Sequence, residues 1–202
     1  MFNFSIKLIS CCLEGIRVLY KAHLKGKDDN SLAFKFSNAQ SQELDKKLIG
    51  ACKIGDVGAV TTRIKEGANV NAKDVFGESA LICALQSGNT KSADFLLTKG
   101  ADVNAVNIFG YTPLIYSASN GYADIVRVLI ENGAQINATD SYGWTPLMSA
   151  VYGSHMEIVQ TLIKNGANVN AKNKLDKSIM DVAKYKAQPE IIQVLKEAGA
   201  QD

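Results

Sequence analysis

The chain has 202 residues, of which 47% are hydrophobic and 21% are charged. This composition is typical of a folded globular protein, and it excludes a disordered or collagen-like chain. The 22 Lys and Arg residues nearly balance the 20 Asp and Glu residues, which leaves a formal charge of +2. Because nucleic-acid binders usually carry a large basic excess, we expect no nucleic-acid partner.

The first 26 residues have the pattern of an amphipathic helix. Apolar residues recur at three- and four-residue steps between Ile9 and Leu24, and polar residues such as Lys7 and Arg17 lie opposite them. That spacing predicts an N-terminal amphipathic helix over residues 1–26, followed by a polar linker over residues 27–40. Six basic and three acidic residues give residues 1–40 a charge of +3, so the rest of the chain carries −1.

Three interpretations of this N-terminal segment stay open. The helix packs on the end of the folded region as a cap, or it lies on a membrane surface through residues 4–25. In the second case Cys11 and Cys12 are candidate lipidation sites, because stable anchoring takes two signals. In the third, Leu8-Ile9-Ser10-Cys11 resembles the cleavage box of an export signal, although Lys7 interrupts its short apolar stretch.

From residue 41 onward the sequence repeats every 33 residues. The segment from Gly67 to Ala72 recurs with close similarity from Gly100, Gly133 and Gly166, and Gly199-Ala200 begins the series again. A second marker keeps the same step, because a hydroxyl residue that can cap a helix stands at four equivalent positions, two of them followed by Pro-Leu: Ser79, Thr112, Thr145 and Ser178. An apolar run then ends at each repeated glycine, so each unit is predicted to be helix, turn, helix and loop.

These residues resemble the ankyrin repeat, whose 33-residue unit carries the signature T-P-L-H-x-A. The resemblance implies an all-α solenoid in which each repeat is a helix-turn-helix followed by a β-hairpin loop. The repeats would span residues 41–73, 74–106, 107–139, 140–172 and 173–202, with the first and last as end caps. The histidine of the signature is replaced here, in order, by Ile82, Ile115, Met148 and Asp181.

The resemblance also implies a protein-binding surface, made by residues beside each hairpin glycine and on each first helix. The residues predicted to bind the partner are Phe76, Glu78, Phe109, Tyr111, Tyr142, Trp144, Tyr152, Lys177 and Tyr185. Large aromatic side chains are frequent anchors of protein interfaces. The alternative for Phe76, Phe109 and Tyr142 is that each packs against the next hairpin.

Charge is expected to vary along this surface. Three acidic residues lie toward its first repeats, namely Glu43, Asp45 and Glu78, and three lysines lie toward its last, namely Lys174, Lys177 and Lys186. Such a gradient would favour one orientation of a charged partner segment.

The sequence offers no site for catalysis, a metal or a cofactor. The cysteines at 11, 12, 52 and 83 form no Cys-x-x-Cys pair, and neither of the two histidines has a ligand at metal-binding spacing. Phosphate-binding glycine loops and nucleophile motifs are also missing. We therefore expect a non-catalytic, monomeric scaffold of the cytoplasm that binds an unidentified protein. The alternative is a membrane-associated adaptor or an effector delivered to a host cell, tethered by the N-terminal helix.

Overall fold

The computed structural model describes residues 29–201, and side chains from residue 38 onward. Ser41–Asp202 form one compact unit. Within the described residues the chain forms ten helices and no β-strand longer than a single bridge. The predicted helix over residues 1–26 and the cysteines at 11 and 12 lie outside the described residues.

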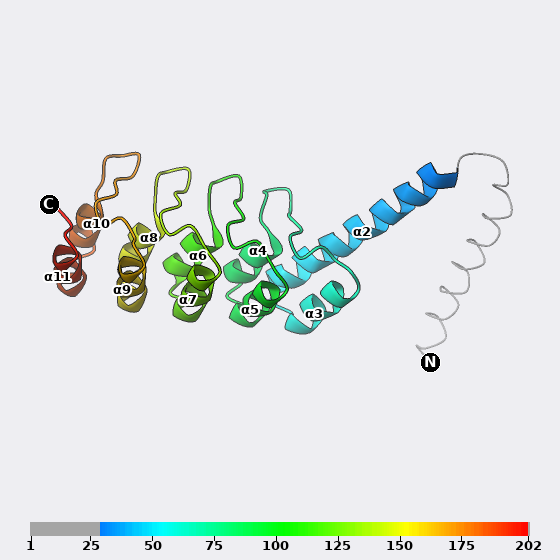
Figure 1. Ribbon diagram of the computed structural model, residues 1–202, viewed down its shortest axis with the longest axis horizontal. Coiled ribbons are helices and arrows are strands. Elements are labelled where there is room, and N and C mark those ends of the chain that lie inside the picture. The colour runs from blue at the N-terminus through cyan, green and yellow to red at the C-terminus, as the bar shows by residue number, and fades with distance from the viewer. Residues whose placement is uncertain (1–28, 202) are drawn as a thin grey trace. The chain divides into compact units, whose positions relative to one another are not determined.

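The ten helices come in five consecutive pairs (Figure 1). In chain order the pairs are α2 (Asp29–Ile54) with α3 (Val57–Lys65), α4 (Ala80–Gln86) with α5 (Thr90–Thr98), α6 (Pro113–Asn120) with α7 (Ala123–Glu131), α8 (Pro146–Tyr152) with α9 (Met156–Lys164), and α10 (Ile179–Tyr185) with α11 (Pro189–Glu197). The first helices α4, α6, α8 and α10 pack in one row, and α3, α5, α7, α9 and α11 in a second. This arrangement confirms the predicted all-α repeat fold.

Each predicted capping residue begins a helix. The side-chain oxygens of Ser79, Thr112, Thr145 and Ser178 accept a hydrogen bond from the amide three residues on, at 3.1–3.2 Å. Those amides belong to the residues that replace the signature histidine. Ile82, Ile115 and Met148 are almost fully buried. Asp181 instead completes a capping box by accepting the Ser178 amide at 2.8 Å.

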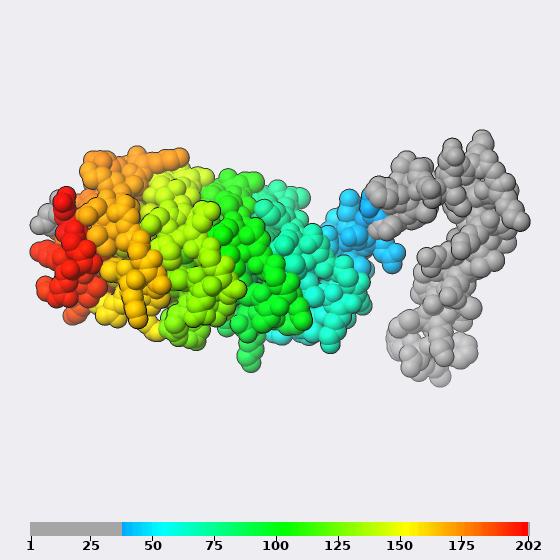
Figure 2. All heavy atoms as spheres, in the orientation of Figure 1, coloured from blue at the N-terminus to red at the C-terminus, as the bar shows by residue number. Residues whose placement is uncertain are grey.

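The core lies between the two rows of helices. It is built from leucines at equivalent positions of successive units, each at most 1% exposed: Leu81, Leu96, Leu114, Leu129, Leu147 and Leu162. One helix pair has no second apolar surface on which to bury these side chains, so each pair depends on its neighbours for its core. Figure 2 shows the successive units packed against one another along the array.

The loops between the pairs are closed by one Asp or Asn each. Asp74, Asn107, Asp140 and Asn173 accept the backbone amides two and four residues on with a side-chain oxygen, at 2.8–3.0 Å. The amide of each also donates to the carbonyl four residues on. These bonds make each loop a hairpin, although the only β-bridges in residues 29–201 are Lys73 with Ser79 and Lys172 with Ser178.

Successive hairpins are joined by backbone hydrogen bonds. The amides of Ile108, Ser141 and Lys174 donate to the carbonyls of Phe76, Phe109 and Tyr142 at 2.9–3.0 Å. A second series involves four asparagines spaced 33 residues apart. The side chains of Asn71, Asn104, Asn137 and Asn170 each accept a hydrogen bond from a backbone amide of the next unit at 2.8 Å. Both series fix the spacing between neighbouring units.

Residues 29–40 differ from the predicted linker, because α2 is helical from Asp29 onward. Gly and Pro are absent between Lys27 and Ile49, so nothing in this segment interrupts a helix. The apolar residues Leu32, Phe34 and Phe36 alternate at two-residue steps and lack the 3.6-residue period of an amphipathic helix, so the sequence pattern did not predict this helix. Each helix in residues 29–201 is too short or too polar to cross a bilayer.

The glycine at the tip of the second hairpin, Gly110, is required by the next hairpin. Gly110 has φ +78°, and a Cβ there would lie 2.8 Å from the Ser141 nitrogen and 2.9 Å from the Asp140 Cα. Gly133 has a similar φ of +83°, but a Cβ there would meet nothing within 4 Å. The two positions therefore share the backbone strain of an added side chain and differ in the steric clash.

We expect Gly110→Ala to destabilise the protein more than Gly133→Ala. The strain common to both should cost about 1 kcal/mol in the free energy of unfolding. The clash in Gly110→Ala should add roughly 1–3 kcal/mol, because the two hairpin backbones have to separate. Urea denaturation of both variants measures the difference, and equal losses would contradict the close hairpin packing.

Candidate functional site

The predicted binding residues lie at equivalent positions of successive units. Phe76, Phe109 and Tyr142 are at the hairpin tips and are 49%, 47% and 64% exposed. Tyr152 and Tyr185 end the first helices α8 and α10 and are 48% and 80% exposed. Each hairpin aromatic also gives its carbonyl to the next hairpin, so its backbone is structural while its ring stays accessible.

The side chains of the earlier units form a satisfied polar network. Gln86 Nε2 donates to Glu78 Oε1 at 2.5 Å and lies 2.8 Å from the Tyr116 hydroxyl. The Tyr116 ring packs on Tyr111, with centroids 5.1 Å apart. Burial raises the pKa of both tyrosines, and Asp140 raises that of Tyr111 further, so both hydroxyls stay protonated at neutral pH. These side chains are bound largely to one another.

Glu78 therefore differs from its predicted role. It is only 8% exposed and its carboxylate accepts the Gln86 amide, so it has little surface to offer a partner. Tyr116 was not among the predicted residues, although it lies at the centre of this network. The signal that could have found it is its position on the first helix, one turn after the Thr112 cap, where it faces the hairpin base carrying Tyr111.

The later units present a more open aromatic cluster. Trp144 is half-buried, and its ring meets Tyr152 edge-on with centroids 5.6 Å apart. The Lys186 ammonium lies over the Tyr152 ring, 4.5 Å from its centroid. Lys177, in the next unit at the position equivalent to Trp144, is exposed. Aromatic surface and positive charge therefore occur together in these units.

The acidic residues at the expected acidic end of the surface are bonded within the protein or buried. Glu43 lies 3.6 Å from Lys47, the Asp45 carboxylate accepts the Asn69 amide at 2.7 Å, and Glu78 is buried. The lysines at the opposite end remain exposed. The two ends therefore differ in accessibility, because the carboxylates of the acidic end are bonded or buried and the lysines of the basic end are exposed.

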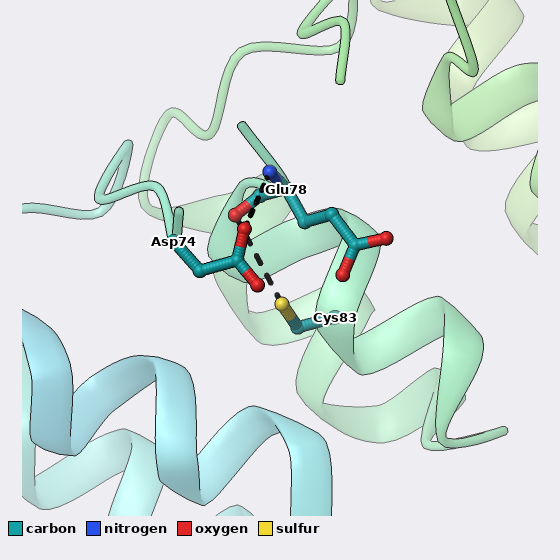
Figure 3. Close-up of side chains that lie close together, drawn as sticks. All are labelled: Asp74, Glu78 and Cys83. Carbon is teal, nitrogen blue, oxygen red and sulfur yellow. Dashed lines mark hydrogen bonds between the residues drawn. The ribbon is translucent and has the colours of Figure 1, made fainter. Parts of the chain in front are cut away.

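Within the described residues, one cluster has enough potential ligand atoms to hold a metal ion. It consists of the side chains of Asp74, Glu78 and Cys83 (Figure 3). Their ligand atoms all lie within 4.8 Å of one another. Each already has a partner, because Asp74 binds Lys53 at 2.6 Å, Glu78 binds Gln86, and the Cys83 thiol lies 3.9 Å from the Glu78 carbonyl. A lysine ammonium on one carboxylate disfavours a cation there, so these residues do not fit a metal.

The thiols near this cluster are unreactive. Burial raises the pKa of Cys52 and of Cys83 to about 12. Because the thiolate is the reactive form, neither group is a nucleophile or a ready metal ligand at neutral pH.

A polar hollow of about 410 Å³ lies elsewhere, at the helix turns, and contains none of the predicted residues; it is lined by Ile54, Gly55, Ser87, Gly88, Asn89, Thr90 and Lys91.

Comparison with known families identifies the repeats. A family model described as "Ankyrin repeats (3 copies)" matches residues 48–140, 101–173 and 136–202. The chain belongs to the ankyrin repeat family. A search of the curated proteins finds no match to the chain. Ankyrin repeats are generally non-catalytic modules that bind other proteins, and the arrangement of this ankyrin array agrees with that general role.

Asp74 is the ankyrin hairpin residue whose charge can be tested separately from its turn. Burial would raise the pKa of its carboxyl, but bonds from Lys53 and from the Glu78 and Phe76 amides outweigh burial and lower it. A carboxyl with a lowered pKa in the folded state stabilises the protein above its unfolded pKa, and this contribution is lost as the pH falls through the folded value. Asn107 and Asn173 close the equivalent turns without a charge.

We expect Asp74→Asn to keep the turn and lose only the ion pair with Lys53. The Lys53 side chain is 43% exposed, so the loss should be under about 1 kcal/mol in the free energy of unfolding at pH 7. It should shrink as the pH falls below 3.8, the ordinary value, and vanish below the lowered pKa. Asp74→Ala should lose a further 1–2 kcal/mol, roughly, because two amides lose their acceptor. Urea denaturation against pH checks both, and a loss for Asp74→Asn that persists at the lowest pH would contradict this account.

Proposed function

We propose that this ankyrin array is a non-catalytic scaffold that binds a partner protein through its hairpins and first helices. The observation that carries the proposal is the series of exposed aromatic rings on a fixed backbone. Tyr142 and Tyr152 lie in one unit and Tyr185 in the next, and each is at least 48% exposed. Soluble proteins seldom expose several large aromatics in one region without a binding role.

The backbone supports this proposal because it is ordered before any partner arrives. Hydrogen bonds between hairpins and within each loop fix the positions from which the aromatic side chains project. A rigid surface loses little conformational entropy on binding, so more of the contact energy appears as affinity. Tyrosine adds a large contact area with a polar tip at low entropic cost.

The chemistry of the described residues supports a non-catalytic role. The cluster at Asp74 is internally bonded, and the two thiols that the structure describes are protonated at neutral pH. Both are also free cysteines, which suits the reducing environment of a cytoplasmic protein. Cytoplasmic localisation is part of this proposal.

The test is to identify a partner by proximity labelling of the full chain and to measure its affinity for purified variants. Tyr152→Ala with Tyr185→Ala should weaken binding by about 2 kcal/mol or more, roughly thirtyfold in Kd. The matched control is Glu131→Ala with Gln160→Ala, which changes exposed residues of the second helices α7 and α9. Unchanged circular dichroism shows that each variant folds. The proposal fails if the tyrosine variant binds the partner as tightly as the unmodified protein does.

A further inference from the structure

The open end of the binding surface carries a specific combination of groups. We call Trp144, Tyr152, Lys174, Lys177, Tyr185 and Lys186 the basic aromatic patch. Trp144 and Tyr152 are in ring contact, Lys186 lies over Tyr152, and helices α8 and α10 pack side by side. Because residues 33 apart occupy equivalent positions of adjacent units, Lys177 neighbours Trp144 and Tyr185 neighbours Tyr152.

The acidic groups near this patch are already used. Asp176 pairs with Lys172 at 3.0 Å. The Asp181 carboxylate accepts the Ser178 amide and hydroxyl at 2.8 and 3.0 Å. Asp140 is 6% exposed and closes its own hairpin. Among the described residues Lys174 and Lys177 form no ion pair, and only the Asp181 carboxylate acts on Lys177, at longer range. The patch therefore carries more positive than negative charge.

We infer that the basic aromatic patch binds an extended acidic segment of the partner protein, in which two carboxylates flank an apolar side chain. The inference rests on the proposed function and adds the chemistry of the partner. The carboxylates would pair with Lys177 and Lys186, and the apolar side chain would pack on Tyr152 and Tyr185. Charge complementarity of this kind selects the partner and its register.

The spacing of the two lysines sets the spacing of the carboxylates. Lys177 precedes helix α10 and Lys186 follows it, so the two residues are about 13 Å apart along the helix axis at a rise of about 1.5 Å per residue. An extended peptide covers that distance in about four residues at about 3.3 Å each. The segment should therefore carry acidic residues about four positions apart, with the apolar residue midway.

A nucleic acid fits the patch less well. Aromatic rings and lysines also bind single strands, but such sites follow a long basic groove. Here the lysines are confined to the last unit, and residues 41–202 carry a net charge of −1. A peptide needs only the two charges that the patch supplies.

The experiment measures binding of defined peptides to the full chain by fluorescence anisotropy at low salt. The probe is a short fluorescein-labelled peptide with two glutamates about four residues apart and a leucine between them in a glycine and serine context. The control peptide has glutamine for both glutamates. We expect the acidic peptide to bind roughly tenfold more tightly than the control, with affinity falling as salt is added.

The protein variants assign that binding to the patch. Lys177→Gln with Lys186→Gln should remove the tenfold preference, whereas Lys65→Gln with Lys164→Gln, which changes exposed lysines of the second helices, should keep it. Equal binding of both peptides, or no binding of the acidic one, would overturn the inference. So would tighter binding of a thymidine oligonucleotide through the same two lysines.

The outcome is separable from that of the proposed function. If the tyrosine variant loses the identified partner and the lysine variant keeps it, the acidic segment is wrong and the scaffold role stands. If the tyrosine variant keeps the partner, the scaffold role through this surface is wrong.

Discussion

The fold depends on hydrogen bonds that no unit completes by itself. The amides of Asp102, Gln135 and Asn168 lie in surface loops, and each donates to an asparagine side chain of the preceding unit at 2.8 Å. Amides of each hairpin likewise donate hydrogen bonds to backbone carbonyls of the preceding hairpin. An isolated unit would lose these bonds together with its leucine core, so stability is a property of neighbouring pairs.

This constraint separates structural from functional positions within one repeat. Residues that bond or pack between units have little freedom to vary, and they recur in sequence: the loop asparagines, the hairpin Asp or Asn, and the core leucines. Side chains beside them, such as Lys177 and Lys186, are exposed and differ from unit to unit. The array can therefore carry a satisfied network at Tyr111 and Tyr116 and an exposed basic surface at Lys177 on the same backbone.

Much of the fold could be predicted because its determinants are local and repeated. The hydroxyl caps Thr112 and Thr145 and the terminal glycines mark each helix, and a 33-residue step repeats the signal. The helix at residues 29–40 was missed because its apolar residues lack the helical period. The burial of Glu78 was missed for a different reason. Its partner Gln86 belongs to the following helix, and Tyr116, which Gln86 also contacts, belongs to the following unit. Such contacts leave no pattern in the local sequence. Whether the exposed aromatics bind a partner stays a prediction.

Hydrogen exchange of the full chain, followed by NMR, tests the dependence between units most directly. If neighbouring units hold the loops, the amides of Asp102, Gln135 and Asn168 should exchange with opening free energies within about 1 kcal/mol of those of the adjacent helices. Exchange of these amides at the rate of an unstructured loop, with the helices still protected, would contradict the account.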